Sequence, residues 1–132
     1  MPPVEDSAAF PSLEHLKSAL QIKRVMEDDH TLFAFPIKCF YRFVPKDTPA
    51  DLQLAVMVPK KRFHHAVDRN RIKRLMRECY RLNKSSLVLP PEQSCQMCWI
   101  FVAHEMPTFG IVEKAVVSIF QNLSSTTEKQ VL

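Results

Sequence analysis

Glycine is almost absent from this chain, since Gly110 is the only one among 132 residues. Sites that hold a nucleotide through a P-loop or a dinucleotide fingerprint need several glycines, because only glycine lets the backbone approach a phosphate closely. The chain is therefore not expected to bind a nucleotide cofactor in either way. It also lacks an uninterrupted apolar run of about 18 residues, so no membrane-spanning segment is predicted.

The ends of the chain differ in composition from the middle. The first ten residues, MPPVEDSAAF, are acidic and contain prolines, unlike a secretory signal peptide, and we expect a cytoplasmic protein. A chain of 132 residues with 46% apolar residues can build one domain with a sizeable core. We expect a flexible tail at residues 1–10, a single domain at residues 11–123 and a second tail at residues 124–132.

Positive charge is concentrated in residues 59–84, PKKRFHHAVDRNRIKRLMRECYRLNK. Ten cations and two acids give this stretch a formal charge of +8. The remaining 8 cations and 12 acids give the rest of the chain a formal charge of −4. Such an asymmetry is typical of proteins that bind a polyanion, most often nucleic acid.

The same block has the period of an amphipathic helix from about residue 66 to residue 83. One side carries an apolar stripe of Ile72, Leu75, Met76, Cys79 and Leu82. The opposite side carries Asn70, Lys73, Arg74, Arg77 and Arg81. No acid lies within this band, with Glu78 just outside its edge, whereas a solvated helix face usually mixes charges of both signs. Because guanidinium groups match phosphate oxygens in pairs, the pattern favours binding to a phosphate backbone.

Residues 66–78, AVDRNRIKRLMRE, resemble the RNR signature of the bacterial ribonuclease P protein subunit. The preceding VPKKRF at residues 58–63 is also similar to that family, with Pro59 in place of a small residue. The resemblance covers most of the chain, more weakly outside this motif. It implies a subunit of the endoribonuclease that removes the 5′ leader from precursor tRNA. In that enzyme the RNA subunit is the catalyst and holds most of the Mg²⁺, which activates water.

The resemblance also implies roles for particular residues. The RNA-binding residues of the domain would be Lys60, Lys61, Arg62, Arg69, Asn70, Arg71, Lys73, Arg74, Arg77 and Arg81. The leader would lie in a cleft between the sheet and the N-terminal helix. Tyr41 stands where a cleft tyrosine is expected, with Phe43 two residues on and therefore on the same strand face. Ile22 and Met26 stand where members often have two phenylalanines, and their helical period leaves leader contact and core packing both open.

The expected elements alternate as in an α+β domain. We expect a helix from Pro11 to about Met26 with Ser12 as its N-cap, strand-like residues 31–44 interrupted by Pro36, and a central strand at residues 52–58. The basic helix, a strand at residues 96–103 and a closing helix at residues 111–123 follow. The core face of that last helix is predicted to be Val112, Ala115, Val116, Ile119, Phe120 and Leu123.

The resemblance implies a small α/β sandwich of the order α-β-β-β-α-β-α, similar to the second domain of a small-subunit ribosomal protein. It also implies a left-handed βαβ crossover around the basic helix. The general rule for parallel strands predicts a right-handed one, so the expected hand comes from the resemblance alone.

No residue of the chain itself is predicted to be catalytic or to bind a metal. Cys95 and Cys98 form a CxxC pair, but a zinc site needs four ligands, and strand residues three apart point to opposite faces, which favours reduced structural thiols. His64 and His65 could act as acid–base groups, although RNA contact is the simpler interpretation. Two other classes stay open, which are a general structured-RNA-binding protein of the ribosomal type and a stand-alone metal-dependent nuclease.

Overall fold

The computed structural model describes residues 14–28, 30–46 and 51–131, with residues 127–131 described by backbone alone. The elements follow in the order α2 (Ala19–Glu27), β1 (Thr31–Ala34), β2 (Ile37–Pro45), β3 (Leu52–Met57), α3 (Ala66–Asn83), the 3-10 turn η2 (Lys84–Ser86), β4 (Gln93–Phe101) and α4 (Phe109–Val131). The strands form one sheet in the order β1-β2-β4-β3. The predicted α+β class and its order of elements are confirmed.

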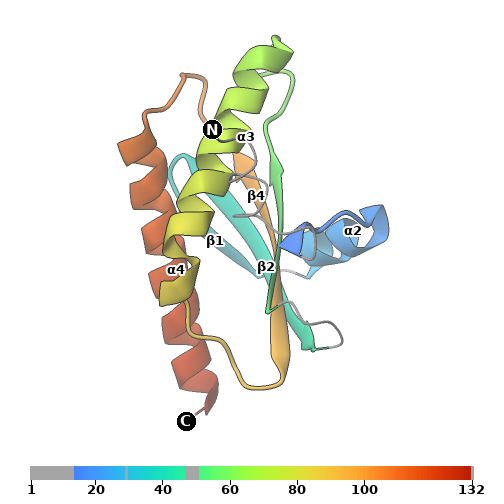
Figure 1. The fold of residues 1–132 in the computed structure, drawn as a ribbon. Helices are drawn as coiled ribbons and strands as arrows, with labels where there is room; N and C mark the ends of the chain where they lie inside the picture. The colour runs from blue at the N-terminus through green and yellow to red at the C-terminus, as the bar shows by residue number, and fades with distance from the viewer. Residues whose placement is uncertain (1–13, 29, 47–50, 132) are drawn as a thin grey trace, which may run out of the picture.

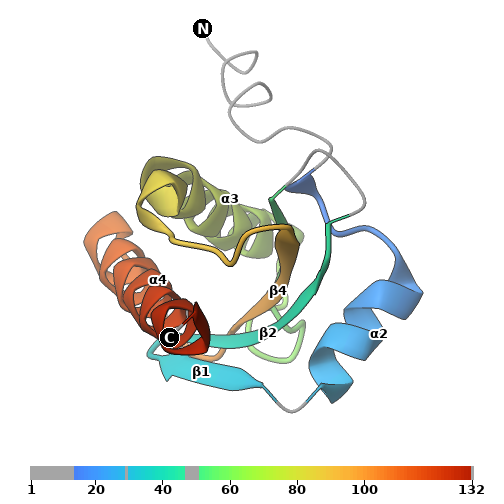
Figure 2. The ribbon, with the colours of Figure 1, turned by 90° about the horizontal axis from the view of Figure 1, so that it is seen from below.

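The sheet is covered by helices on both faces (Figures 1 and 2). The long helices α3 and α4 lie side by side on one face, and the short helix α2 lies on the other. No helix in the described part of the chain is both long and apolar enough to cross a membrane. Each face of the sheet packs against its helices through a separate cluster of buried side chains.

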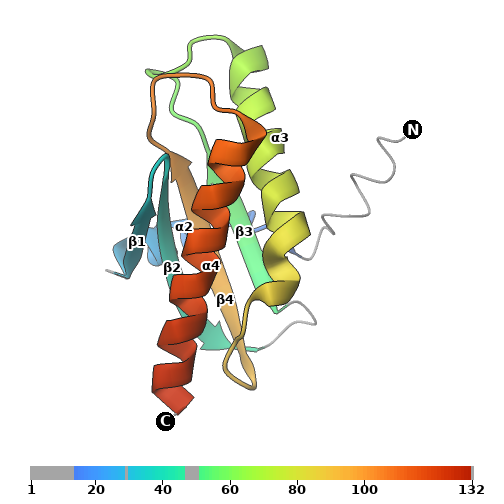
Figure 3. The same ribbon diagram turned by 90° about the vertical axis from the view of Figure 1, so that its left-hand side faces the viewer.

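The connection from β3 through α3 to β4 is a left-handed crossover. Strands β3 and β4 are parallel and adjacent, with Leu54 opposite Met97. When α3 and α4 face the viewer and both strands run upward, β4 lies to the left of β3 (Figure 3). This hand is the rarer one for parallel strands, and it agrees with the resemblance rather than with the general rule.

The main core lies between the sheet and the two long helices. Its centre is aromatic, with the ring of Trp99 in β4 lying 5.8 Å from Phe120 in α4 and 6.0 Å from Tyr80 in α3. The predicted core face of α4 is confirmed, because all six residues named for it are buried. A smaller cluster on the other face joins Val25 of α2 and Leu16 to Cys98 of β4.

One prediction about the strands is corrected by the sheet order. Strand β3 was expected to be central, but it forms one edge of the four-stranded sheet. Its outer side is covered by the segment before α2, where the Leu16 amide donates to the Leu54 carbonyl at 3.0 Å. That cover explains why an edge strand can be as apolar as a central one. The interruption predicted at Pro36 is confirmed, because Pro36 lies at the turn of the hairpin that joins β1 and β2.

Several element ends differ from prediction. Helix α2 begins at Ala19, and its N-cap is Ser18, whose Oγ accepts from the Gln21 amide at 3.3 Å. The predicted N-cap Ser12 and the tail at residues 1–10 lie outside the described residues. Strand β4 covers residues 93–101 rather than 96–103. Helix α4 continues through residue 131, so residues 124–131 are helical instead of a tail.

Candidate nucleic-acid interface

The basic helix is α3, which spans the 18 residues predicted for it. It has Asp68 in its first turn and Arg81 in its last, an arrangement that complements the helix dipole. The helix buries Ile72, Met76, Cys79 and Tyr80. The basic face of α3 consists of the exposed Asn70, Arg71 and Arg74, with the half-buried Lys73, Arg77 and Arg81 at its margins. The predicted separation of an apolar side from a basic side is therefore confirmed.

The buried side is rotated from the predicted stripe because Tyr80 belongs to it. The Tyr80 ring is fully buried, while Leu82 at the end of the stripe is 47% exposed. This rotation brings Arg77 partly under the surface, and burial lowers the pKa of its guanidinium. Arg77 is therefore less available to an external phosphate than Arg74, which lies on the exposed side.

Glu78 belongs to the basic face, contrary to the prediction that it lies just outside. Its carboxylate accepts from the Arg81 guanidinium, with Oε2 3.1 Å from Nε. Arg81 is thus neutralised by a side chain of its own helix. By contrast, no carboxylate of the described residues lies within ion-pair distance of Arg71 or Arg74. These two guanidinium groups are the part of the face most open to an anionic partner.

The loop before α3, residues 59–65, is held in place and is called here the basic loop. The Arg62 amide donates to the Pro59 carbonyl at 3.1 Å, and the Phe63 ring lies 5.8 Å from Phe101 in the core. Arg69 donates through Nη1 to the carbonyl oxygens of Phe63 and His64, at 2.8 and 2.9 Å. Arg69 therefore braces this loop, a contact that the sequence did not reveal. Lys60 and Lys61 are exposed on it.

The prediction that Tyr41 and Phe43 face the N-terminal helix is wrong, because their side chains lie on the opposite face of β2. Both side chains face α3 and α4, where Tyr41 is 7% exposed and belongs to the main core. Burial raises the pKa of the Tyr41 hydroxyl. The neighbouring Phe40 is the residue that packs on the α2 side, opposite Cys98 of β4. The alternation along β2 separates an apolar face from a mixed one, but it does not show which of the two meets α2.

The α2 side of β2 carries Lys38, Phe40 and Arg42, called here the α2-side strip. The Lys38 ammonium lies 5.0 Å from the centre of the Phe40 ring. Arg42 Nε donates to Gln96 Oε1 at 3.1 Å, and Gln96 Nε2 donates to Gln53 Oε1 at 3.0 Å. The strip therefore combines a partly exposed ring with two cations, which are the groups that hold a single-stranded nucleic acid. The prediction missed it by choosing the opposite face.

Ile22 and Met26 on α2 differ in their surroundings. Ile22 is half-buried and packs against the cluster of Leu16, Val25 and Cys98, so it contributes to the contact between α2 and the sheet. Met26 is 36% exposed. Core packing thus accounts for Ile22, and a contact of either residue with a leader stays a prediction.

The four cysteines are buried free thiols. Cys95 packs in the main core and Cys98 in the cluster beneath α2, so the CxxC pair points to opposite faces of β4 as predicted. Burial raises the pKa of Cys95 to about 12 and that of Cys98 to about 11. Both thiols therefore stay protonated at neutral pH, the form that binds metals poorly and reacts slowly.

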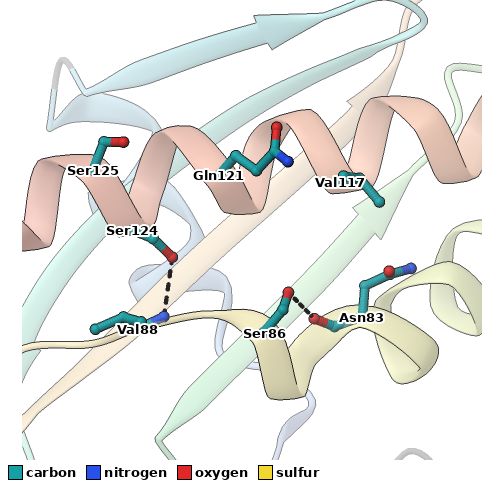
Figure 4. A pocket seen from close by; sticks show the side chains of 7 residues that line it. All are labelled: Asn83, Ser86, Val88, Val117, Gln121, Ser124 and Ser125. Atoms are coloured by element: carbon teal, nitrogen blue, oxygen red, sulfur yellow. Dashed lines mark hydrogen bonds between the residues drawn. The ribbon is translucent and has the colours of Figure 1, made fainter.

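A cavity of about 520 Å³ lies away from the basic loop, between the end of α3 and the second half of α4 (Figure 4). Ser124 accepts from the Val88 amide at 3.0 Å on one side of it, and Ser86 donates to the Asn83 carbonyl at 2.7 Å. Its lining consists of Asn83, Ser86, Val88, Val117, Gln121, Ser124 and Ser125. None of these residues is charged or able to act as a strong nucleophile, so the cavity does not compete with the basic surface as a functional site.

Known proteins with similar sequences and folds belong to one family. The model of the family described as Ribonuclease P matches residues 10–124. The chain belongs to the ribonuclease P protein family. The ribonuclease P protein component of Porphyromonas gingivalis is 38% identical over 99 residues, which cover 73% of this chain and 72% of that protein. The component of Chlorobium phaeobacteroides is 33% identical over 101 residues, covering 66% of this chain and 68% of that one.

Solved structures of ribonuclease P proteins share the fold. The protein of Staphylococcus aureus superposes with a TM-score of 0.66 at 17% identity, covering 86% of this chain and 97% of that one. The protein of Thermotoga maritima gives 0.66 at 18% identity, covering 83% and 96%. Membership of this family implies that the chain is a subunit of an RNA-processing endoribonuclease.

Proposed function

We propose that this chain docks onto the catalytic RNA of ribonuclease P through the basic face of α3 and the basic loop. The observation that carries the proposal is the exposure of Arg71 and Arg74 on a rigid helix, with no carboxylate of the described residues within ion-pair distance. Their mutual repulsion is relieved by a phosphate backbone, which each guanidinium can bind in a bidentate way. Lys60 and Lys61 add two further cations on the adjoining loop.

The 5′ leader of precursor tRNA is proposed to lie across the α2-side strip. Phe40 offers a partly exposed ring for a base, while Lys38 and Arg42 flank it with positive charge. Stacking on a ring combined with phosphate neutralisation suits a single strand of any sequence. This assignment replaces Tyr41 and Phe43, whose side chains lie in the main core on the other face of the sheet.

The hydrolysis is proposed to be performed by the RNA subunit, with Mg²⁺ held mainly there. The docking surface carries cations, the amide of Asn70 and two exposed histidines, and its carboxylate, Glu78, is paired with Arg81. Mg²⁺ prefers carboxylate, phosphate and water oxygens, which the phosphates of the RNA supply. The protein then acts by neutralising phosphates and by holding the substrate, and the endonucleolytic 5′ maturation of tRNA belongs to the assembled ribonucleoprotein.

Reconstitution tests this proposal. The protein, the ribonuclease P RNA of the same organism and a labelled precursor tRNA are mixed at low magnesium concentration, where neutralisation by the protein matters most. We expect release of the intact 5′ leader, faster than with the RNA alone. Cleavage by the protein without RNA would instead indicate a stand-alone nuclease, and equal binding to unrelated structured RNAs would indicate a general RNA-binding protein.

The docking surface is tested by the double variant Arg71→Ala with Arg74→Ala. We expect weaker binding to the catalytic RNA and a salt slope reduced by about 1.8, or about 0.9 for each lost phosphate contact. Lys46→Ala is the matched control, because Lys46 pairs with Asp51 at the end of the sheet opposite the basic loop. A double variant whose salt slope equals that of the control would exclude this face of α3 as the docking surface.

A further inference from the structure

The basic loop touches a second loop through one polar contact. Nη1 of Arg62 lies 2.8 Å from Nε2 of His104. His104 belongs to the connection between β4 and α4, which reaches the same end of the molecule as the basic loop (Figure 3). The sequence predicts that Arg62 lies in the RNA surface and indicates no such role for His104.

The chemistry of the contact fixes the direction of the hydrogen bond. A guanidinium has donors and no acceptor, so Nε2 of His104 must be the accepting nitrogen. In the neutral imidazole the proton then resides on Nδ1, which becomes a donor. The pair therefore presents the remaining guanidinium protons and one imidazole N–H, while keeping a single positive charge.

The Arg62 side chain is half-buried, and the loop that carries it is held in place. Its Nε is buried and makes no hydrogen bond within the described part of the chain. The backbone around it is fixed by the turn at Pro59, by the Phe63 ring against Phe101 and by the bonds that Arg69 donates to the loop carbonyls. An arginine held in this way loses less conformational entropy on binding than a free surface side chain.

We infer that Arg62 and His104 form one phosphate-binding site, in which His104 is a positioning residue for the Arg62 guanidinium. This inference rests on the proposed function and extends the RNA surface from the basic loop onto the β4–α4 loop. The ligand is a phosphodiester of RNA, because its anionic oxygens accept from all the donors that the pair presents. Lys60 and Lys61 are exposed on the same loop and add to the attraction, while Glu105, which follows His104, is the acid closest to it in sequence.

A double-mutant cycle tests the site with the full-length protein. Binding is measured to the catalytic RNA alone, and separately binding of precursor tRNA by the reconstituted enzyme, which distinguishes the two RNAs that could supply the phosphate. In one of these arms we expect Arg62→Ala to weaken binding about tenfold and to lower the salt slope by about 0.9. His104→Ala is expected to weaken it about threefold, and the double variant about as much as Arg62→Ala.

His104→Gln separates positioning from charge. The glutamine carbonyl can still accept from Arg62, so this variant is expected to bind within about twofold of the wild type. Two results would overturn the inference. In one, the loss of affinity of the double variant equals the combined losses of the two single variants, and in the other His104→Ala loses no affinity in either arm. Arg74→Ala is measured alongside. If Arg74→Ala weakens binding and the Arg62 and His104 variants do not, only this inference fails. If none of them does, the proposed docking surface fails.

The free protein gives a second readout, which tests the hydrogen bond between Arg62 and His104 directly. Long-range ¹H–¹⁵N spectra of the imidazole report which ring nitrogen carries the proton. We expect the Nδ1–H tautomer of His104 in the wild type and a shift toward Nε2–H in Arg62→Ala. A wild-type His104 with its proton on Nε2 would rule out the pair.

Discussion

Glu78 and Arg81 lie one turn apart on α3 and are joined by two hydrogen bonds from the guanidinium to the carboxylate. The hydrogen bond from Arg81 lowers the pKa of Glu78, and the charge of Arg81 adds to this effect. The carboxylate is therefore ionised at neutral pH, where it occupies Arg81 and places a negative charge on the basic face of α3. An incoming phosphate has to compete with it.

Glu78→Gln removes that competitor, so the first prediction is tighter binding to the catalytic RNA. We expect a gain of about threefold to tenfold and a salt slope steeper by up to about 0.9, because the negative charge of Glu78 no longer opposes a phosphate at this face. Filter binding over a range of salt concentrations measures both. Glu27→Gln on α2 removes the same charge elsewhere, and a Glu78→Gln variant that behaves like it would show that Arg81 does not meet RNA.

The same variant is expected to change stability only slightly. A carboxyl with a lowered pKa contributes stability above its ordinary pKa of 4.5 and loses it as the pH falls through its folded value. Both side chains are about one-third exposed, so solvent screening keeps this contribution below about 0.5 kcal/mol. The free energy of unfolding in urea should therefore differ between wild type and Glu78→Gln by less than about 0.5 kcal/mol at pH 7, and this difference should vanish at pH 3.

The second prediction separates Arg74 from Arg77. Arg74 is exposed, so Arg74→Ala should weaken RNA binding and change the free energy of unfolding by less than about 0.5 kcal/mol. Arg77 is half-buried, and burial lowers the pKa of its guanidinium, so Arg77→Ala should destabilise the protein by about 1 kcal/mol through lost packing. Urea titrations of the two variants decide this, and equal stabilities would contradict the difference in burial.

The basic helix was predictable to the residue because its signals are local. Its heptad-like apolar spacing, its charges and its ends at Ala66 and Asn83 all agree. The rotation of its buried side was not predictable, because it depends on where Trp99 and Phe120 place the ring of Tyr80. A tyrosine reads as amphipathic in a sequence, and only the tertiary partners decide whether it belongs to the core.

The leader face was misassigned for a different reason. Strand β2 alternates clearly, because an apolar face with Tyr41 and Phe43 is opposed by a mixed face with Lys38, Phe40 and Arg42. The alternation separates these two faces, but it does not tell which of them α2 covers, since that depends on the packing of distant helices. The length of α4 was missed because its Ser- and Thr-rich end has weak apolar periodicity, and the central position given to β3 was wrong because its covering segment is distant in sequence.

The third prediction contrasts the two faces of β2. Lys38→Ala should weaken binding of precursor tRNA to the reconstituted enzyme, by about threefold to tenfold, and leave mature tRNA unaffected, because only the precursor has a leader. Tyr41→Ala should instead destabilise the protein by about 3 kcal/mol through loss of core packing, with no preference between the two RNAs once folded. A selective loss for the precursor with Tyr41→Ala would return that residue to the leader site.

The fourth prediction concerns alkaline stability. The pKa values of Cys79 and Cys95 are raised to about 12 and that of Cys98 to about 11, from an ordinary value of 9.0. Above pH 9 the unfolded thiols lose protons while the folded ones keep them, so the free energy of unfolding falls as the pH rises. Each thiol contributes up to about 1.4 kcal/mol per pH unit. Urea unfolding at pH 8, 9 and 10 should therefore show a shallower decline for Cys98→Ala than for the wild type.

The fifth prediction concerns Glu14, which ties the segment before α2 to the end of α3. The hydroxyl of Tyr80 donates to Glu14 Oε1, and the Lys84 ammonium lies 2.9 Å from Glu14 Oε2. Its side chain is only 15% exposed, so loss of the carboxylate is costly. Glu14→Ala should destabilise the protein by about 1–3 kcal/mol. Chemical denaturation measures the loss, with the exposed Lys17→Ala as control.

The same variant should loosen the cover of β3. Two residues beyond Glu14, the amide of Leu16 donates to the carbonyl of Leu54 at 3.0 Å and closes that edge of the sheet. Hydrogen exchange at Leu16 should therefore accelerate in Glu14→Ala, and less in Glu14→Gln, whose side-chain carbonyl can still accept from the Tyr80 hydroxyl. Helix α2 begins three residues after Leu16, so a looser segment would also leave the α2-side strip less well formed. Unchanged exchange at Leu16 would mean that the hydrogen bond to β3 holds the segment without help from Glu14.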